Sequence, residues 1–232
     1  MELTIRSIGH RGDGLAEREG RAFAVPKTLP GEVVRLDDGK APEILTPSPD
    51  RVVPVCPYFA ACGGCALQHW DRERYRYWKR KLLVKALDAR GIEPTVAELL
   101  DAHGAGRRRV SLHVRRIDGR WQAGFMAART HDLCPIGRCP IVVPALQEAT
   151  AIAAACGELF GDCDVAVTAA DNGLDVSVKA ERLKADPHLH RAPEILHRFS
   201  LARLSVNGDL AAGAAKPLVT MGTVEVPLPM RS

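Results

Sequence analysis

Hydrophobic and polar positions alternate in short runs over the first fifty residues. The β-prone runs 3–8, 22–25 and 32–36 are separated by the turn signals Gly12-Asp13-Gly14, Glu19-Gly20, Leu29-Pro30-Gly31 and Asp38-Gly39. Closely spaced strands joined by such turns are typical of a small β-barrel. We therefore predict an OB-like barrel domain at residues 1–47, and the proline-rich stretch 47–55 marks the boundary with a second domain at 48–232.

The pattern becomes helical after Asp71. Apolar residues recur at three- and four-residue steps along one face as far as residue 90, namely Tyr75, Trp78, Leu82, Ala86 and Ala89. Another face is basic and carries Arg72, Arg76, Lys79 and Arg80. Gly91 is placed to end the helix. The pattern predicts an amphipathic helix with one basic face.

Hairpins and helices alternate in the rest of the chain. The predicted elements are a hairpin with strands 110–115 and 121–125 about Asp118-Gly119, a helix 144–160, a hairpin 164–170 and 174–180, a helical stretch 193–198, a hairpin 201–206 and 210–212 about Asn207-Gly208, and strands 217–221 and 223–228. This arrangement predicts an α+β fold for the second domain.

Three of the seven cysteines lie within ten residues. Cys56, Cys62 and Cys65 are spaced C-x5-C-x2-C, and the two-residue gap lets the last two thiolates point at one centre. Gly63 and Gly64 are expected to take the positive φ values of a tight loop. The spacing predicts a metal or iron–sulfur loop. It needs a fourth ligand, for which Cys139 is the best candidate and Cys134 the second. Four thiolates suit zinc or a cluster equally.

The other cysteines and the histidines carry no such pattern. Cys156 and Cys163 have no close partner, so we interpret them as reduced, partly buried thiols. An odd number of cysteines in a chain this large argues against a disulfide framework. His188, His190 and His197 lack metal-ligand spacing, and we expect them to be surface or capping residues.

Charge and hydropathy narrow the function classes. The hydrophobic fraction of 46% permits a core, and no apolar run approaches the length that spans a bilayer. A cytoplasmic, monomeric protein without a membrane partner is the expectation. The net charge of +4 permits an anionic partner without requiring one.

The basic residues cluster in ways that suit RNA, although each cluster alone could be a solvated surface. Gly104-Ala105-Gly106 leads into three arginines and a strand, so backbone and guanidinium groups can both approach phosphate. Together with the basic helix and the basic loops of the barrel, this favours nucleic acid. The predicted RNA-binding residues are Arg11, Lys27, Arg76, Lys79, Arg107, Arg108, Arg109 and Arg115.

Several motifs resemble one family, the RNA uracil-5-methyltransferases. They are C-P-Y-F-x-x-C-G-G-C-x-L-Q-H from Cys56, R-R-R-x-x-x-H-V-R-R from Arg107, G-F-x-A-x-x-x-H-D from Gly124 and C-P-I-V-x-P-A-L from Cys139. The segments I-x-x-I-G-H-R-G-D-G-L-A and V-P-x-T-L-P-G-E resemble the TRAM domain of that family, an OB-like RNA-binding barrel.

The resemblance carries expectations about function. Family members make 5-methyluridine in ribosomal or transfer RNA with S-adenosylmethionine as the methyl donor, so structured RNA is the expected partner. It implies a 4Fe–4S cluster whose ligands fall on Cys56, Cys62, Cys65 and Cys139. Chemistry on a base edge implies that the target uridine leaves the stack.

The chain departs from the family in its catalytic half. That half is a Rossmann-like domain with the cofactor site, a nucleophilic cysteine and a glutamate base, and no glycine-rich loop after a strand matches it here. We expect no catalytic residue and no S-adenosylmethionine site in this chain, which would be the N-terminal portion of an enzyme and inactive alone. The alternative is a stand-alone RNA-binding iron–sulfur or zinc module.

Overall fold

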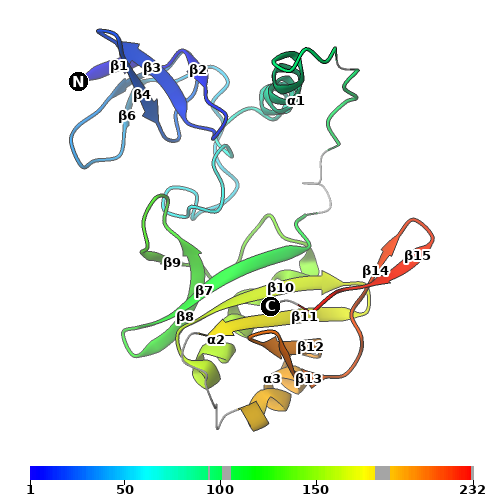
Figure 1. Ribbon diagram of the computed structural model, residues 1–232. Helices are drawn as coiled ribbons and strands as arrows, with labels where there is room; N and C mark the ends of the chain where they lie inside the picture. Colours follow the sequence, from blue (N-terminus) through cyan, green and yellow to red (C-terminus); the bar gives the residue numbers. More distant parts are fainter. Residues whose placement is uncertain (94, 101–105, 181–188, 231–232) are drawn as a thin grey trace. The chain divides into compact units, whose positions relative to one another are not determined.

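The computed structural model describes residues 1–93, 95–100, 106–180 and 189–230 (Figure 1). It divides into two compact units. The first consists of Met1–Ala60 and Cys65–Asp101, and the second of Ala61–Gly64 and Ala102–Ser232. No helix among the described residues has the length and apolar character that crossing a membrane requires. The predicted division at residue 47 remains a prediction.

Two three-stranded antiparallel sheets form the N-terminal part of the first unit. One has the order β1 (Glu2–Thr4), β5 (Val33–Arg35) and β6 (Glu43–Thr46), and the other has the order β2 (Ser7–Ile8), β3 (Gly14–Arg18) and β4 (Arg21–Val25). The predicted first strand changes sheet between β1 and β2. There the Ile5 N–H donates to the Glu32 carbonyl and the Arg6 N–H donates to the Leu15 carbonyl, each at 2.8 Å.

The expected OB-like barrel is not closed in this region. Within the described residues no ladder joins β4 to β6, so the two sheets stay open at that side. They nevertheless share one core, to which Leu3, Ile5, Ala16, Val25 and Val34 contribute. The short β-prone runs of the sequence do not by themselves decide whether the outer strands meet.

Helix α1 (Arg72–Asp88) completes the first unit close to the predicted bounds. The Asp71 carboxylate caps it by accepting the backbone N–H of Glu73 at 3.1 Å and of Arg74 at 3.0 Å. Gly91 follows with a φ of +70°, as expected of a residue after a helix end. None of the 17 residues of α1 is buried.

A seven-stranded sheet dominates the second unit, in the order β13-β12-β11-β10-β7-β8-β9 (Figure 1). The strands are β7 (Arg109–Ile117), β8 (Arg120–Met126), β9 (Leu133–Pro135), β10 (Cys163–Ala170), β11 (Gly173–Ala180), β12 (Leu201–Val206) and β13 (Asp209–Gly213). All neighbours are antiparallel except β11 and β12, which are parallel. A separate ribbon pairs β14 (Leu218–Met221) with β15 (Val224–Pro227).

Two helices pack against this sheet. Helix α2 (Ala149–Phe160) packs against β7, β8 and β10, and α3 (Ala192–Arg198) packs against β12 and β13. The predicted helix 144–160 is divided, because a short 3-10 helix, η2 (Pro144–Leu146), precedes α2. A second 3-10 helix, η3 (Leu189–Arg191), precedes α3. The fold is thus mixed, with mostly sheet and few helices, as the α+β expectation required.

The predicted hairpin turns are confirmed. Asp118 and Gly119 both have positive φ, +49° and +77°, and so do Asn207 and Gly208, at +49° and +93°. Two consecutive residues with positive φ match the twist of antiparallel strands, and Asp-Gly and Asn-Gly pairs adopt them readily. The sequence prediction missed β3, β6 and β9, which are short or lie between turns.

A buried ion pair fixes the far end of the chain on the sheet. Arg203 on β12 donates to both carboxylate oxygens of Asp175 on β11, at 2.8 and 2.9 Å, and both side chains are buried. Its guanidinium also donates to the carbonyls of Leu228 and Pro229, at 3.3 and 3.0 Å. The parallel pairing of β11 and β12 is what brings the two charged residues together.

Candidate functional site

The cysteine loop begins in the first unit. The Cys56 backbone N–H donates to Gln68 Oε1 at 3.2 Å, and the Cys56 carbonyl accepts the Phe59 N–H at 3.1 Å. Cys56 and Cys65 are both half-buried. Gln68 Nε2 is buried and has no hydrogen-bond partner among the described residues. A buried amide N–H without an acceptor is a donor that a thiolate or sulfide ligand could use.

Lys27 holds the same loop from the β-sheet region. Its ammonium group donates to the Ala60 carbonyl at 2.5 Å and lies 5.4 Å from the centre of the Phe59 ring. Lys27 itself has a φ of +58°, an uncommon conformation for a residue other than glycine. These contacts give Lys27 a role in positioning the loop, and its predicted RNA contact remains a prediction.

The middle of the cysteine loop, Ala61–Gly64, belongs to the second unit. Cys62 pairs with Ala127, and the Gly63 N–H donates to the Met126 carbonyl at 3.0 Å, next to the end of β8. The Gly64 N–H donates to Cys62 Sγ at 3.3 Å. An amide N–H aimed at sulfur stabilises a thiolate, the form that binds metal.

The expected positive φ values of the two glycines are wrong. Neither Gly63 nor Gly64 is left-handed. Glycine is required at position 63 because a Cβ there would lie 2.7 Å from the Met126 carbonyl oxygen. Close approach of two backbones, and not an unusual turn, is the physical reason for this glycine.

The two candidates for the fourth ligand occupy different environments in the second unit. Cys134 lies within β9, opposite Phe125 of β8, and is buried. Cys139 follows β9, outside any strand or helix, and is half-buried. Its carbonyl accepts a hydrogen bond from Gln147 Nε2 at 3.3 Å. A half-buried loop cysteine is better suited to a ligand than one in a sheet ladder.

The structure does not gather the predicted ligands within one unit. Cys56 and Cys65 belong to the first unit, and Cys62 and Cys139 to the second. Among the described residues no group of three or more His, Cys, Asp or Glu side chains is placed to hold a metal ion. The donor set still fits a cluster chemically, since it offers four thiols, none of the seven cysteines is in a disulfide, and N–H donors lie at the loop.

Cys156 and Cys163 carry free thiols, as expected, but they are more deeply buried than the prediction had them. Cys156 and Cys163 are buried, at 0% and 3% exposure, and burial raises the pKa of the Cys163 thiol to about 12. Burial also raises the pKa of the Cys156 thiol well above its ordinary range. Both are therefore inert core thiols. His190 and His197 are exposed, as expected, and His188 lies outside the described residues.

The arginine run that starts at Arg107 divides into two kinds of residue. Arg107 and Arg109 are exposed, and no described residue pairs with their guanidinium groups. Arg108 instead donates to the Ala169 carbonyl at 3.1 Å and to Asp171 Oδ1 at 2.5 Å. The hydrogen bond from Arg108, together with those from Thr220, lowers the pKa of Asp171 to about 2.

Arg115 is likewise engaged inside the second unit. Its guanidinium donates to the carbonyls of Val114 and Cys163, at 2.8 and 3.3 Å, and lies 3.8 Å from Asp164. Ahead of the run, Gly106 has a φ of +79°, and a Cβ there would lie 2.8 Å from the Val142 backbone. Gly104 and Ala105 lie outside the described residues.

The predicted basic residues of the first unit also differ in the contacts that their side chains make within the unit. Arg76 on α1 donates to the Leu99 carbonyl at 3.0 Å, so it holds the segment that follows the helix. Lys79 is exposed and lies 5.5 Å from the centre of the Trp78 ring. Arg11 is exposed near the start of β3. The RNA contacts of Arg11, Arg76 and Lys79 remain predictions.

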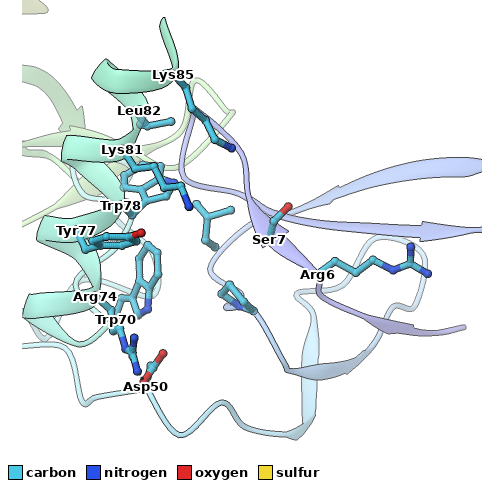
Figure 2. A pocket seen from close by; sticks show the side chains of 12 residues that line it. Arg6, Ser7, Asp50, Trp70, Arg74, Tyr77, Trp78, Lys81, Leu82 and Lys85 are labelled. Atoms are coloured by element: carbon cyan, nitrogen blue, oxygen red, sulfur yellow. Dashed lines mark ion pairs between the residues drawn. The ribbon is translucent and has the colours of Figure 1, made fainter. Parts of the chain in front are cut away.

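A cleft in the first unit was missed by the sequence prediction. It has a volume of about 350 Å³ and is lined from α1 and from the β-sheet region (Figure 2). The lining residues are Arg6, Ser7, Ile8, Pro30, Asp50, Trp70, Arg74, Tyr77, Trp78, Lys81, Leu82 and Lys85. Six of these lie on α1 at three- and four-residue steps, a signal that a search for purely apolar stripes passes over.

A buried carboxylate holds the segment before the cysteine loop on the sheets. Glu32 is fully buried and accepts both Nε and Nη2 of Arg51, at 2.5 and 2.8 Å, and the N–H groups of Leu29 and Ser48. Burial alone would raise the pKa of Glu32, but the hydrogen bonds from Arg51 and from the two amides lower it. The sequence prediction gave Glu32 no role.

Comparison with known proteins identifies the class. The chain is 39% identical to a Caulobacter vibrioides protein named an uncharacterized RNA methyltransferase, over 99% of this chain and 59% of that protein. It is 37% identical to a Brucella suis protein of the same description, over 98% of this chain and 57% of that protein. No family model matches the chain. The chain thus spans a little more than half the length of these two curated relatives.

Two further relatives carry a more specific name and match a shorter part of the chain. Over 63% of its length the chain is 37% identical to a Halomonas elongata protein named 23S rRNA (uracil(1939)-C(5))-methyltransferase, of which it covers 33%. A protein of the same name from Alkalilimnicola ehrlichii is 31% identical over 64% of the chain. The chain belongs to the family of these RNA methyltransferases, as the cysteine and arginine motifs predicted.

Proposed function

We propose that this chain is the RNA-recognition part of an RNA (uracil-5-)methyltransferase that acts on structured ribosomal or transfer RNA. The observation that carries the proposal is 39% identity over 99% of the chain to a protein named an RNA methyltransferase. The relatives named as 23S rRNA enzymes favour ribosomal RNA as the substrate. The methyl group would come from S-adenosylmethionine and would be transferred to C5 of a uridine.

The proposed site residues divide into cluster ligands and RNA contacts. Cys56, Cys62, Cys65 and Cys139 would hold a 4Fe–4S cluster, which supplies a structural tie between segments of the chain. Supporting observations are the Gly64 N–H on Cys62 Sγ and the spare donor of Gln68. Among the RNA contacts, Arg107 and Arg109 are the strongest candidates, because both are exposed and neither guanidinium pairs with a described residue. Residues 1–47 would serve as a TRAM-like RNA-binding domain.

The activity is tested in cells of the source organism. Deleting the gene and mapping 5-methyluridine in ribosomal and transfer RNA by mass spectrometry should reveal one uridine that loses its methyl group. Restoring the intact gene should restore the methylation, and a gene encoding Cys139→Ser should restore it poorly. An unchanged set of 5-methyluridines would contradict the proposal and favour an RNA-binding iron–sulfur or zinc module without catalysis.

The cluster is tested on this chain purified without oxygen. The proposal predicts a brown protein with iron and acid-labile sulfide in near-equal amounts. Cys139→Ser should abolish cluster retention, whereas Cys134→Ser and the core control Cys163→Ser should keep it. If Cys134→Ser abolished cluster retention and Cys139→Ser did not, Cys134 would be the fourth ligand. A colourless protein with one zinc ion would show that the site binds zinc and not a cluster.

RNA binding is tested by salt titration. Binding of a 23S rRNA transcript should weaken steeply as salt rises, because each phosphate contact releases counterions. Arg107→Ala together with Arg109→Ala should reduce the slope by about two contacts. Substituting Arg108 should instead destabilise the fold near Asp171, because its guanidinium is used there. Binding that does not depend on salt would count against the RNA proposal.

A further inference from the structure

We infer that the cleft of the first unit is a subsite for one unpaired nucleotide of the bound RNA, with its base against the aromatic rings and its phosphate near two lysines. This inference rests on the proposed RNA function and deepens it by assigning a site to residues that motif spacing did not select. The cleft lies wholly within the first unit, between α1 and the β2 region (Figure 2).

The helical face that lines the cleft is only partly covered. Arg74, Tyr77, Trp78, Lys81, Leu82 and Lys85 share this face. Most amphipathic helices of this length bury an apolar stripe, but α1 buries none of its residues. The face therefore offers apolar and aromatic surface to a ligand, since the β-sheet region across the cleft does not seal it.

Aromatic rings form one wall of the cleft. Trp70 is 8% exposed and packs against Trp78, with ring centroids 5.8 Å apart at an angle of 57°. Tyr77 is 62% exposed, so its ring is accessible. Aromatic side chains of this kind bind nucleobases by stacking, which tolerates any base because every base has a π face.

The charge at the cleft is suited to phosphate. Arg74 lies 3.4 Å from Asp50, so these two charges offset one another. Lys81 and Lys85 have no acidic partner in the part of the chain that the structure describes, and both extend over the cleft (Figure 2). The Lys81 ammonium also lies 5.5 Å from the centre of the Tyr77 ring. Arg6 lines the cleft, but its guanidinium points away from α1 (Figure 2).

Size and chemistry together favour a single nucleotide over other anionic partners. A volume of about 350 Å³ is at the lower end of small-molecule sites, too small for a duplex. A lipid surface would call for protruding apolar side chains, but here Trp70 is recessed and Trp78 and Leu82 are half-buried. A base reaches a recessed ring only when it is unstacked, as in loops and bulges of structured RNA.

Tryptophan fluorescence gives a direct test, because two of the three tryptophans lie at the cleft. In a Trp121→Phe variant of the chain, only Trp70 and Trp78 report. An oligouridylate of about ten nucleotides should quench this fluorescence. This length lies within the range that a single OB-fold domain covers. An abasic ribose-phosphate chain of the same length should bind more weakly and should not quench it.

Variants locate the effect. Tyr77→Ala should weaken oligouridylate binding by at least about fivefold, the lower limit for loss of one stacking ring. Lys81→Ala with Lys85→Ala should weaken it by about tenfold and reduce its salt dependence. Lys40→Ala is the matched control, because Lys40 is an exposed lysine of the same unit that pairs with Asp37 and does not line the cleft. Circular dichroism should show that all variants remain folded.

Other outcomes overturn the inference in distinguishable ways. Equal binding and equal quenching by the abasic chain would mean that no base is held. Preference for phosphatidylserine vesicles over RNA would make the face a lipid surface. If the cleft variants left RNA binding unchanged while 23S rRNA binding still depended on Arg107 and Arg109, the nucleotide subsite would be refuted and the proposed function would stand. If the unaltered chain bound no RNA, the proposed function would be refuted as well.

Discussion

Helices α1 and α2 are the two longest among the described residues, and they differ in what covers them. Helix α2 buries eight of its twelve residues against the large sheet, whereas α1 buries none of its 17. Helix α2 has no basic residue, and α1 is rich in lysine and arginine. The comparison separates a helix that stabilises a fold from one that presents a surface, although both show helical periodicity in the sequence.

The charged side chains of the two units follow the same division. In the second unit Arg108, Arg115 and Arg203 all donate to internal acceptors. In the first unit Lys81 and Lys85 have no acidic partner among the described residues. A cation already held by a carboxylate contributes little to a polyanion, so Lys81 and Lys85 are better candidates for RNA than Arg108, which pairs with Asp171.

The largest expected effect tests the internal pairing of the second unit. Asp175→Ala leaves the Arg203 guanidinium buried without its carboxylate, so the free energy of unfolding should fall by about 3–5 kcal/mol. Urea unfolding measures it. Replacing both residues by leucine should recover much of the loss. Glu19→Ala, which breaks the exposed pair with Arg18, should cost under about 0.5 kcal/mol. Equal costs for the two single variants would contradict this account.

The next prediction compares the helices directly. Ile152→Ala on α2 removes a fully buried side chain and should destabilise the second unit by about 3 kcal/mol through lost burial and a cavity. Leu83→Ala on α1, where the leucine is 51% exposed, should change stability by less than about 0.5 kcal/mol. Native-state hydrogen exchange resolves each helix separately. A large cost at Leu83 would show that α1 is covered in solution.

A pH effect should distinguish the first unit. Burial, and then the nearby charge of Arg51, lower the pKa of His69 to about 4 from an ordinary 6.5. Below pH 6.5 the unfolded chain binds a proton that the folded chain does not, so stability should fall between about pH 6.5 and 4. The loss is on the order of 2–3 kcal/mol.

The variant His69→Leu is the control for this effect. It should flatten the dependence between about pH 6.5 and 4. Glu32 acts in a lower window, since its pKa is lowered and its contribution is lost only as the pH falls below the ordinary value of 4.5. Thermal melts followed by circular dichroism over this pH range measure the dependence of stability on pH. If His69→Leu showed the same dependence as the unaltered chain, His69 would be excluded as its cause.

The smallest effect concerns the helix ends. Asp71→Ala removes the cap of α1 and should cost about 1 kcal/mol, measured as faster amide exchange in its first turn. Glu148 stands at the same position before α2 but makes no capping hydrogen bond. Glu148→Ala should therefore cost under about 0.5 kcal/mol. Similar costs at the two caps would mean that tertiary packing, and not capping, starts α1.

Local signals made much of the fold predictable. Asp118-Gly119 and Asn207-Gly208 form the expected hairpin turns, because their preference for positive φ is a property of the residues themselves. Asp71 and Gly91 flank α1 for similarly local reasons. Two features were not predictable in this way. The open edge between β4 and β6 and the parallel pairing of β11 with β12 depend on segments far apart in the chain.

The candidate site shows the same limit. Spacing selected Cys56, Cys62 and Cys65, and it could not choose between Cys134 and Cys139, whose environments differ only after folding. Gly63 was correctly singled out for the wrong reason, since its close contact with Met126 comes from a distant strand. The sequence named Arg108 and Arg115 as RNA contacts, but it could not show that both guanidiniums have internal acceptors.

The sequence by itself determined the family, the cysteine loop, the helix ends and most hairpins, because each depends on residues close together in the chain. Only the tertiary structure decided which charges remain available and where α1 faces a cleft. Those properties depend on what packs against a side chain, and the packing partners come from segments that are far apart in the sequence. Lys81 and Arg108 are both basic residues in basic stretches, and only folding makes one exposed to a cleft and the other a partner of Asp171.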